Sequence, residues 1–307
     1  MKEHKERIVI VSPVRDEAEY IERTIRSIMR QTTRPVEWVI VDDGSSDGTR
    51  KIVERLTRGV DWIRLVRRED RGRRAVGPGV VEAFYYGYEH IRTRRYDYIC
   101  KLDGDIELNP DYFATLLAKF AADPRLGAAS GKPFLVTEDG RVIPERTSDE
   151  MVVGAVNFYR QSCFESIGGF VREVHWDGIA FHQCRRRGWR TCSFADPALA
   201  IYHNRMMGAS EKSIFEGRLR WGRGQWFLGT HPLYLLGIGA YRALERPFVI
   251  GGALIVAGYI QAWWRGMRRY GDSDFRSSLH AWQMERLGLG RRLEPVSVPA
   301  DMGGASL

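Results

Sequence analysis

The chain has 307 residues, with 47 Lys and Arg, 39 Asp and Glu, and a formal net charge of +8. A hydrophobic fraction of 44% and a charged fraction of 28% are ordinary for a globular protein, which excludes disordered, collagen-like and multi-span membrane chains. The excess charge is local, because residues 1–204 carry +2, residues 205–292 carry +8 and residues 293–307 carry −2. Since the first 204 residues are nearly neutral, nucleic acid is not expected as a partner.

Cysteine usage and the N-terminus point to the cytoplasm. The four cysteines form no CxxC pair, which favours reduced thiols. The first residues, MKEHKER, have mixed charge, and the apolar run that follows is too short for a secretory signal peptide.

Short apolar runs alternate with helical patterns in the first third of the chain. The predicted strands cover residues 8–11, 38–41, 62–66 and 96–103, and the predicted helices cover 17–31, a segment from Thr49 onward, and 75–92. This alternation predicts an α/β fold with a mostly parallel sheet and helices on both faces.

Acidic residues follow three of these strands. The segments are Ser12–Glu17, Asp42–Ser45 and Asp103–Asp105. Ligands bind outside the carboxyl ends of parallel strands, so we expect the three segments to converge at one edge of the sheet. Carboxylates this close repel one another unless a cation joins them, and Mg²⁺ or Mn²⁺ suits such oxygen ligands. For each segment taken alone, a plain turn or a helix cap is the alternative.

Four segments of the chain, in this order, resemble family 2 glycosyltransferases of the GT-A fold. They are VSPVRDEAEYIERTIRSIMRQT, VIVDDGSSDGT, YICKLDGDIELNPDYF and IGGFVREVHWDGIAFHQCRRRGWR. The resemblance implies a GT-A, Rossmann-like catalytic domain over residues 1–204. Its nucleotide-sugar half is about 1–105, and its acceptor and base half is about 106–204. The implied reaction is metal-dependent transfer of a sugar, with inversion, from a nucleotide-diphosphate sugar, preferably a UDP-sugar, to an acceptor hydroxyl.

The resemblance also implies roles for individual residues. Asp177 is implied as the catalytic base. Asp103 is implied to contact the ribose and, with Asp105, the metal-bound diphosphate, while His203 completes the shell of the Mn²⁺ or Mg²⁺ ion. The implied donor contacts are Pro13, Arg15, Glu17, Asp42 and Asp43, with Arg73 or Arg74 at the diphosphate. A solvated basic loop remains the alternative for the two arginines, and a packed or surface histidine remains the alternative for His203.

Asp177 and its neighbour have further interpretations. An Asp commonly caps a helix, here one over 179–187, and a helix N-terminus stabilises the ionised carboxylate that a base requires. The family usually has an acidic pair here, whereas this chain has Trp176 and Asp177, which leaves Glu173 as the alternative base. Trp176 is either an acceptor-side platform or a packed aromatic.

The C-terminal region, residues 205–292, is expected to be helical, with apolar segments at 233–241 and 247–264. The longer segment has 18 uncharged residues, close to the roughly 20 that a spanning helix needs. Its flanking Arg residues and its Trp pair predict a helix or shallow hairpin at the inner face of the cell membrane. A buried helix pair is the alternative. The membrane location in turn suggests a lipid-linked acceptor or a cell-envelope glycan.

The rest of this region gives weaker predictions. The RLRW segment partly matches the QxxRW motif of processive polysaccharide synthases, but Gly217 replaces the Gln. Arg220 and Trp221 are therefore lesser candidates for acceptor-side contacts. Residues 272–289 form an amphipathic pattern, and 293–307 form a tail.

Two other functions remain open from the sequence. A nucleotidyltransferase also uses an acidic edge of an α/β sheet, but it usually has a glycine-rich phosphate loop after the first strand, where this chain has SPVRDE. A non-enzymatic basic membrane-binding protein would spread basic residues over the whole fold, and residues 1–204 do not show this.

Overall fold

The structure of the protein is a computed structural model that describes residues 6–70, 72, 77–137, 139–204, 214–244 and 248–290. These residues form two compact units, one within 6–204 and one within 214–290. Arg73, Arg74 and the tail over 293–307, for which the sequence makes predictions, lie outside the described residues.

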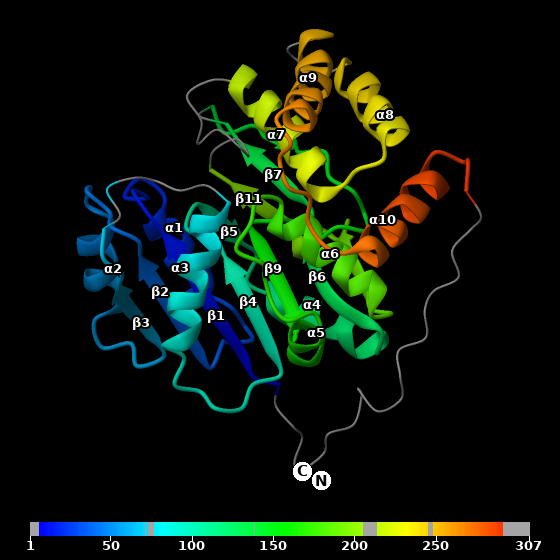
Figure 1. Ribbon diagram of the computed structural model, residues 1–307. Helices are drawn as coiled ribbons and strands as arrows, with labels where there is room; N and C mark the ends of the chain where they lie inside the picture. Colours follow the sequence, from blue (N-terminus) through cyan, green and yellow to red (C-terminus); the bar gives the residue numbers. More distant parts are fainter. Residues whose placement is uncertain are drawn as a thin grey trace. The chain divides into compact units, whose positions relative to one another are not determined.

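A seven-stranded sheet forms the centre of the first unit (Figure 1), in the order β10-β6-β9-β4-β1-β2-β3. Its strands are β1 (Ile8–Val14), β2 (Glu37–Asp42), β3 (Ile63–Arg67), β4 (Tyr98–Leu102), β6 (Leu126–Gly131), β9 (Val156–Arg160) and β10 (Arg190–Phe194). Strand β9 runs antiparallel to β4 and β6, and the other neighbouring pairs are parallel. The predicted mostly parallel α/β fold is confirmed.

Helices cover both faces of this sheet. Helices α1 (Ile21–Met29), α2 (Thr49–Thr57) and α4 (Tyr112–Ala122) contribute to one core, and α3 (Pro78–Glu89), α5 (Gln161–Ser166) and α6 (Trp176–Arg186) contribute to the other. Successive side chains of a strand point to opposite faces. In β1, Ile8 and Ile10 therefore enter the first core, and Val9 and Val11 enter the second. Both faces of the strand are apolar, which explains its continuous hydrophobic run.

A smaller four-stranded sheet carries residues from the second half of this unit. Its order is β5 (Ile106–Leu108), β11 (Ile201–His203), β7 (Pro133–Val136) and β8 (Val142–Pro144), and a short 3₁₀ helix (Pro197–Leu199) precedes β11. Strand β11 is antiparallel to β5 and places His203 opposite Ile106. His203 therefore lies one strand away from the end of the Asp103–Asp105 segment.

The second unit is helical. It contains α7 (Ile214–Leu228), α8 (Pro232–Arg242), α9 (Ile250–Trp264) and α10 (Ser273–Arg286). Helix α9 packs against α7 and α8 around a small core that includes Trp226, Leu235 and Ile255. Within the apolar segment predicted over 247–264, helix α9 begins at Ile250 and ends at Trp264.

Among the described residues, no helix combines the length and the apolar character needed to cross a membrane.

Candidate active site

The acidic segments after β1, β2 and β4 meet as expected, because β1 lies between β2 and β4. Val14 at the end of β1 pairs with Asp42 at the end of β2, and the Asp43 amide donates a 2.9 Å hydrogen bond to the Val14 carbonyl. Pro13 lies within the same pairing, opposite Val41. The loops after β1 and β2 thus leave the sheet side by side.

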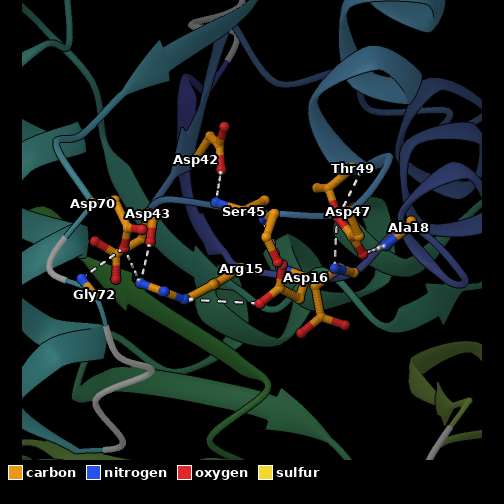
Figure 2. Close-up of polar contacts among 12 residues, drawn as sticks. Arg15, Asp16, Ala18, Asp42, Asp43, Ser45, Asp47, Thr49, Asp70 and Gly72 are labelled. Carbon is orange, nitrogen blue, oxygen red and sulfur yellow. Dashed lines mark hydrogen bonds and ion pairs between the residues drawn. The ribbon is translucent and has the colours of Figure 1, made fainter.

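Arg15 joins these two loops (Figure 2). Its Nη1 donates to the Asp43 carbonyl at 2.9 Å and forms an ion pair with Asp70 Oδ1 at 3.0 Å. Asp70 also accepts a hydrogen bond from the amide of Gly72. Gly44 has a φ of 81°, and a Cβ there would lie 2.6 Å from Asp70 Oδ1, so this position requires glycine. The guanidinium is therefore held in one place at the strand ends.

The Asp16–Ser45 region fixes the second loop against the first. Asp16 Oδ1 accepts from the Ser46 amide at 2.8 Å, and the Asp16 amide donates to Ser45 Oγ at 3.1 Å. Asp42 Oδ1 accepts from the Ser45 amide at 2.8 Å. The buried Asp42 carboxylate therefore organises its own loop.

Two further buried carboxylates lie at this edge. The Glu17 amide donates to Thr49 Oγ1 at 2.8 Å, which anchors the start of the β1 loop to α2. Asp43 Oδ1 accepts from Arg68 Nη1 at 3.0 Å, and Arg68 Nη2 pairs with Glu82 at 3.1 Å. No motif surrounds Arg68, so sequence reasoning did not select it, yet its guanidinium pairs with Asp43, one of the predicted donor contacts.

Lys101 links the Asp103 turn to the beginning of α6. Its ammonium is buried, donates to the Asp103 carboxylate and to the Gly154 carbonyl at 2.8 Å, and lies 5.5 Å from the centre of the Trp176 ring. A Cβ on Gly154 would lie 3.8 Å from Asp177 Oδ2. Asp103 thus contacts Lys101, and Asp177 lies near Gly154, whose carbonyl the same lysine contacts. A lysine inside the apolar run YDYICKLD is a sequence feature that could have identified this residue.

The structure corrects the expected start of the helix at Asp177. Helix α6 begins at Trp176, after His175 with a φ of 58°, so Asp177 lies in the first turn and does not cap a helix over 179–187. Its Oδ1 accepts from the Gly178 amide at 2.8 Å. Trp176 is buried, with its ring centre 4.8 Å from that of Phe170, which favours the packed-aromatic interpretation.

Asp105 and His203 lie on adjacent segments of the smaller sheet. The Asn204 amide donates to the Asp105 carbonyl at 3.1 Å. His203 Nδ1 is 2.6 Å from Glu145 Oε2, a partner that the sequence analysis missed. A carboxylate on one ring nitrogen commonly orients a histidine that binds a metal through the other. The residue types therefore suit a hard divalent ion.

No three His, Cys, Asp or Glu side chains within the described ranges are arranged as a metal cluster. An ion such as Mg²⁺ typically takes one or two protein carboxylates and completes its shell with substrate phosphates and water. The Asp103–Asp105 turn fits that kind of shared site.

Arg220 and Trp221 belong to α7 of the second unit. Two guanidinium groups lie over the Trp221 ring, that of Arg242 at 4.8 Å and that of Arg218 at 5.7 Å from its centre. These contacts explain the packing of Trp221 within its own unit, and an acceptor-side role for either residue stays a prediction.

Comparison with known proteins decides the family. The model of glycosyl transferase family 2 matches residues 9–203. The chain belongs to this family. Family 2 membership makes the protein a glycosyltransferase and sets aside both the nucleotidyltransferase and the non-enzymatic alternatives.

Similar proteins include glycan-forming and sugar-transferring enzymes. Poly-β-1,6-N-acetyl-D-glucosamine synthase of Staphylococcus aureus (strain COL) is 30% identical over 119 residues, which cover 38% of this chain and 26% of that protein. The match thus spans about a quarter of the relative's length.

Two solved structures are similar in fold. Mannosyltransferase PcManGT from Pyrobaculum calidifontis, in complex with GDP-Man and Mn²⁺, has a TM-score of 0.57 at 18% identity, covering 85% of this chain and 88% of that chain. S. aureus TarS 1-349 in complex with UDP-GlcNAc has a TM-score of 0.51 at 14% identity, with 95% of each chain covered. This likeness shows a GT-A-like fold for the family 2 enzyme.

Proposed function

We propose that this family 2 enzyme transfers a sugar, with inversion, from a nucleotide-diphosphate sugar to an acceptor hydroxyl. The observation that carries the proposal is the bridge made by Lys101 between Asp103 and Gly154, beside which the Asp177 carboxylate lies. A donor-side carboxylate and a candidate base are thereby brought to one end of the sheet. The similar proteins PcManGT and TarS, solved with GDP-Man and UDP-GlcNAc, support a nucleotide-sugar donor, and a UDP-sugar is our first choice.

The loops after β1 and β2 would hold the nucleoside. Carboxylates accept hydrogen bonds from base N–H groups and ribose hydroxyls, and the carboxylate candidates here are Glu17, Asp42 and Asp43. Pro13, at the end of β1, is a candidate contact from the backbone of the same loop. Arg15 supplies a fixed guanidinium at the same edge, suited to a phosphate oxygen. Arg73 and Arg74 remain candidates for the diphosphate from the sequence alone.

Asp103, Asp105 and His203 would hold a Mn²⁺ or Mg²⁺ ion. When bound, such an ion offsets the negative charge that grows on the departing diphosphate. Glu145 would fix the orientation of the His203 ring through its contact with Nδ1.

Asp177 would act as the base. Its carboxylate accepts the proton of the acceptor hydroxyl while the acceptor oxygen forms a bond to the anomeric carbon. The bond from that carbon to the diphosphate breaks with its electron pair, and the nucleoside diphosphate leaves from the opposite face. This single displacement inverts the anomeric centre and needs no protein nucleophile. Glu173, in the loop before α6, is the second candidate.

We further propose that the enzyme works in the cytoplasm, at the inner face of the cell membrane. The net charge of +8 on residues 205–292 and the apolar side chains exposed on the second unit support this location. A lipid-linked acceptor or a cell-envelope glycan would be consistent with it.

Thermal unfolding of the full chain with Mn²⁺ and a panel of nucleotides and nucleotide sugars tests the donor proposal. At least one nucleotide sugar should raise the Tm, and Asp103→Ala should lose that increase. Asp139→Ala removes an exposed carboxylate paired with Arg141 and serves as the matched control, which should keep the increase. If no nucleotide or nucleotide sugar stabilises the wild-type chain, the proposal is wrong.

A further inference from the structure

Helices α8 and α9 of the second unit lie side by side (Figure 1). Both helices expose apolar side chains, as do Leu244 after α8 and Val249 before α9. Leu244 is 76% exposed, Val249 70% and Trp264 87%. On α9, the exposed positions Ala253, Ala257, Ile260 and Trp264 follow a spacing of three or four residues, which places them in one stripe. Exposed apolar side chains therefore occur on α8, on α9 and at the described positions next to both helices.

The polar side chains of α9 are directed into the unit. Apart from its tryptophans, the helix has two such side chains, Tyr259 and Gln261. Tyr259 donates its hydroxyl proton to the Thr230 carbonyl at 2.8 Å, and Gln261 Oε1 accepts from Arg223 Nη1 at 3.0 Å. These contacts leave the outer stripe of α9 without a hydrogen-bonding group before Trp263.

Close backbone packing fixes the orientation of α9. A Cβ on Gly252 would lie 2.1 Å from the Gly239 carbonyl oxygen of α8, and a Cβ on Gly258 would lie 2.1 Å from the Leu219 carbonyl oxygen of α7. Rotation of α9 to bury its outer stripe would break both approaches. The exposure of the stripe is thus a built-in feature of the unit.

The charge of the sequence around the hairpin is mostly positive. Between Glu216 and Asp272 the sequence contains eight arginines and one acidic residue, Glu245. Arg265 follows Trp264 directly, Arg268 and Arg269 follow within the next turn of chain, and all three are exposed. Arg268 and Arg269 also lie over the rings of Phe227 and Trp226. A second copy of the chain docked on the same surface would bring these arginines against each other, whereas anionic lipid headgroups would attract them.

We propose that the α8–α9 hairpin inserts its exposed apolar surface into one leaflet of an anionic bilayer, with Arg265, Arg268 and Arg269 among the headgroups. Helix α9 has 15 residues. It is therefore about 22 Å long, shorter than the roughly 30 Å hydrocarbon core. Trp263 and Trp264, next to the arginines, suit the membrane–water interface. This inference rests on the proposed membrane location and adds the surface, the depth and the lipid class.

Vesicle flotation of the full chain tests the inference. The wild type should float with vesicles of phosphatidylcholine containing about one third phosphatidylglycerol, and much less with phosphatidylcholine alone. Leu244→Glu/Val249→Glu should lower the floated fraction about tenfold, because charged side chains at the hairpin tip oppose insertion. Val142→Glu/Ile143→Glu is the matched control, since it adds the same charges at two exposed apolar positions on β8, and it should float like the wild type.

The outcomes separate lipid from other occupants. Equal flotation of the wild type and Leu244→Glu/Val249→Glu would overturn the inference, as would equal binding to both kinds of vesicle. If light scattering shows a wild-type dimer that dissociates only in Leu244→Glu/Val249→Glu, the surface binds a second copy of the chain, and the inference is also overturned. Leu244→Asn/Val249→Asn, which adds no charge, replaces the Glu pair if that pair fails to fold.

A second readout reports where the hairpin sits. Lipids brominated in the acyl chains should quench the tryptophan fluorescence of the bound wild type, and Trp263→Phe/Trp264→Phe should remove most of that quenching. Unchanged quenching in this variant would contradict insertion of the hairpin. Vesicle binding needs no nucleotide and donor stabilisation needs no vesicle, so either proposal can fail while the other holds.

Discussion

The ammonium of Lys101 donates a hydrogen bond to the carboxylate of Asp103, and the lysine is almost completely buried where it does so. The same ammonium holds the Gly154 carbonyl and faces the ring of Trp176, the residue before Asp177. One cation therefore sets the position of the donor-side carboxylate and supports the loop against which the proposed base lies.

Replacing Lys101 should impair transfer more than it impairs folding. Lys101→Met removes the lysine donor of the Asp103 carboxylate and one of the two donors of the Gly154 carbonyl, which keeps its bond from Asn157 Nδ2. We therefore expect kcat to fall about a hundredfold and donor binding to weaken. Lys119→Met, which breaks an exposed pair with Asp196, should change kcat little. Steady-state rates, with the Tm of each variant, check this. A Lys101→Met enzyme with normal kcat would show that the bridge has no part in positioning.

Arg15 should act on donor binding. Arg15→Leu removes the contacts to the Asp43 carbonyl and to Asp70, together with the guanidinium proposed to meet the phosphates, so the Kd for the donor should rise about tenfold. Isothermal titration with the nucleotide sugar that stabilises the wild type measures this. Arg50→Leu removes an exposed pair with Glu54 on α2 and is the control. An equal change of the donor Kd in both variants would mean that Arg15 acts only through its net positive charge and not through contact with the donor.

The proposed ion predicts dependence on a divalent metal. Treatment with a chelator should abolish nucleotide release from the sugar donor, and Mn²⁺ or Mg²⁺ should restore it. Glu145→Gln, which alters the carboxylate that contacts His203, should weaken Mn²⁺ affinity by about tenfold, as measured by electron paramagnetic resonance of the free ion. Full activity in the presence of the chelator would contradict the metal assignment.

Acid should destabilise the first unit through His182. Burial lowers the pKa of His182 on α6 to about 3. The histidine therefore stays neutral in the folded chain while its unfolded counterpart gains a proton below about pH 6.5. The stabilising contribution is present above that pH and is lost as the pH falls toward 3, by up to about 1.4 kcal/mol per pH unit.

His182→Leu should remove this part of the acid dependence. Urea unfolding at several pH values between 7 and 5 would show a shallower fall in the free energy of unfolding than the wild type shows. Phe181→Leu changes the neighbouring buried residue of α6 without removing a titratable group, so it should leave the slope unchanged. A wild-type slope in His182→Leu would mean that other groups cause the acid sensitivity.

The sequence predicted the first half of the fold better than the second. The runs IVIV and WVIV became β1 and β2, because strands buried on both faces are continuously apolar. Strand β6, with the sequence LGAASG, lacks the β-branched residues that mark a strand. Its pairing with β9 and β10 depends on contacts between distant segments, which local patterns do not contain.

The candidate site was also only partly predictable from the sequence. The acidic ends of β1 and β2 were predictable from the position of Asp42 and Asp43 after an apolar strand, and their loops do meet. The contact between Lys101 and Gly154, and the pair of His203 with Glu145, join residues more than fifty positions apart. The first contact depends on the pairing of β4 with β9, and the second depends on the pairing of β11, β7 and β8 in the smaller sheet, so neither has a local sequence pattern.

The most direct test of the proposed reaction compares donor binding and nucleotide release in Asp177→Asn. With the nucleotide sugar that stabilises the wild type, this variant should bind the donor with an unchanged Kd. In the transfer reaction it should release nucleoside diphosphate about a thousandfold more slowly, because an amide cannot take the acceptor proton. Glu173→Gln should keep both the wild-type Kd for the donor and the wild-type rate of nucleoside diphosphate release. If Asp177→Asn keeps the wild-type rate, Asp177 is not the base, and loss of the rate in Glu173→Gln would place the base there.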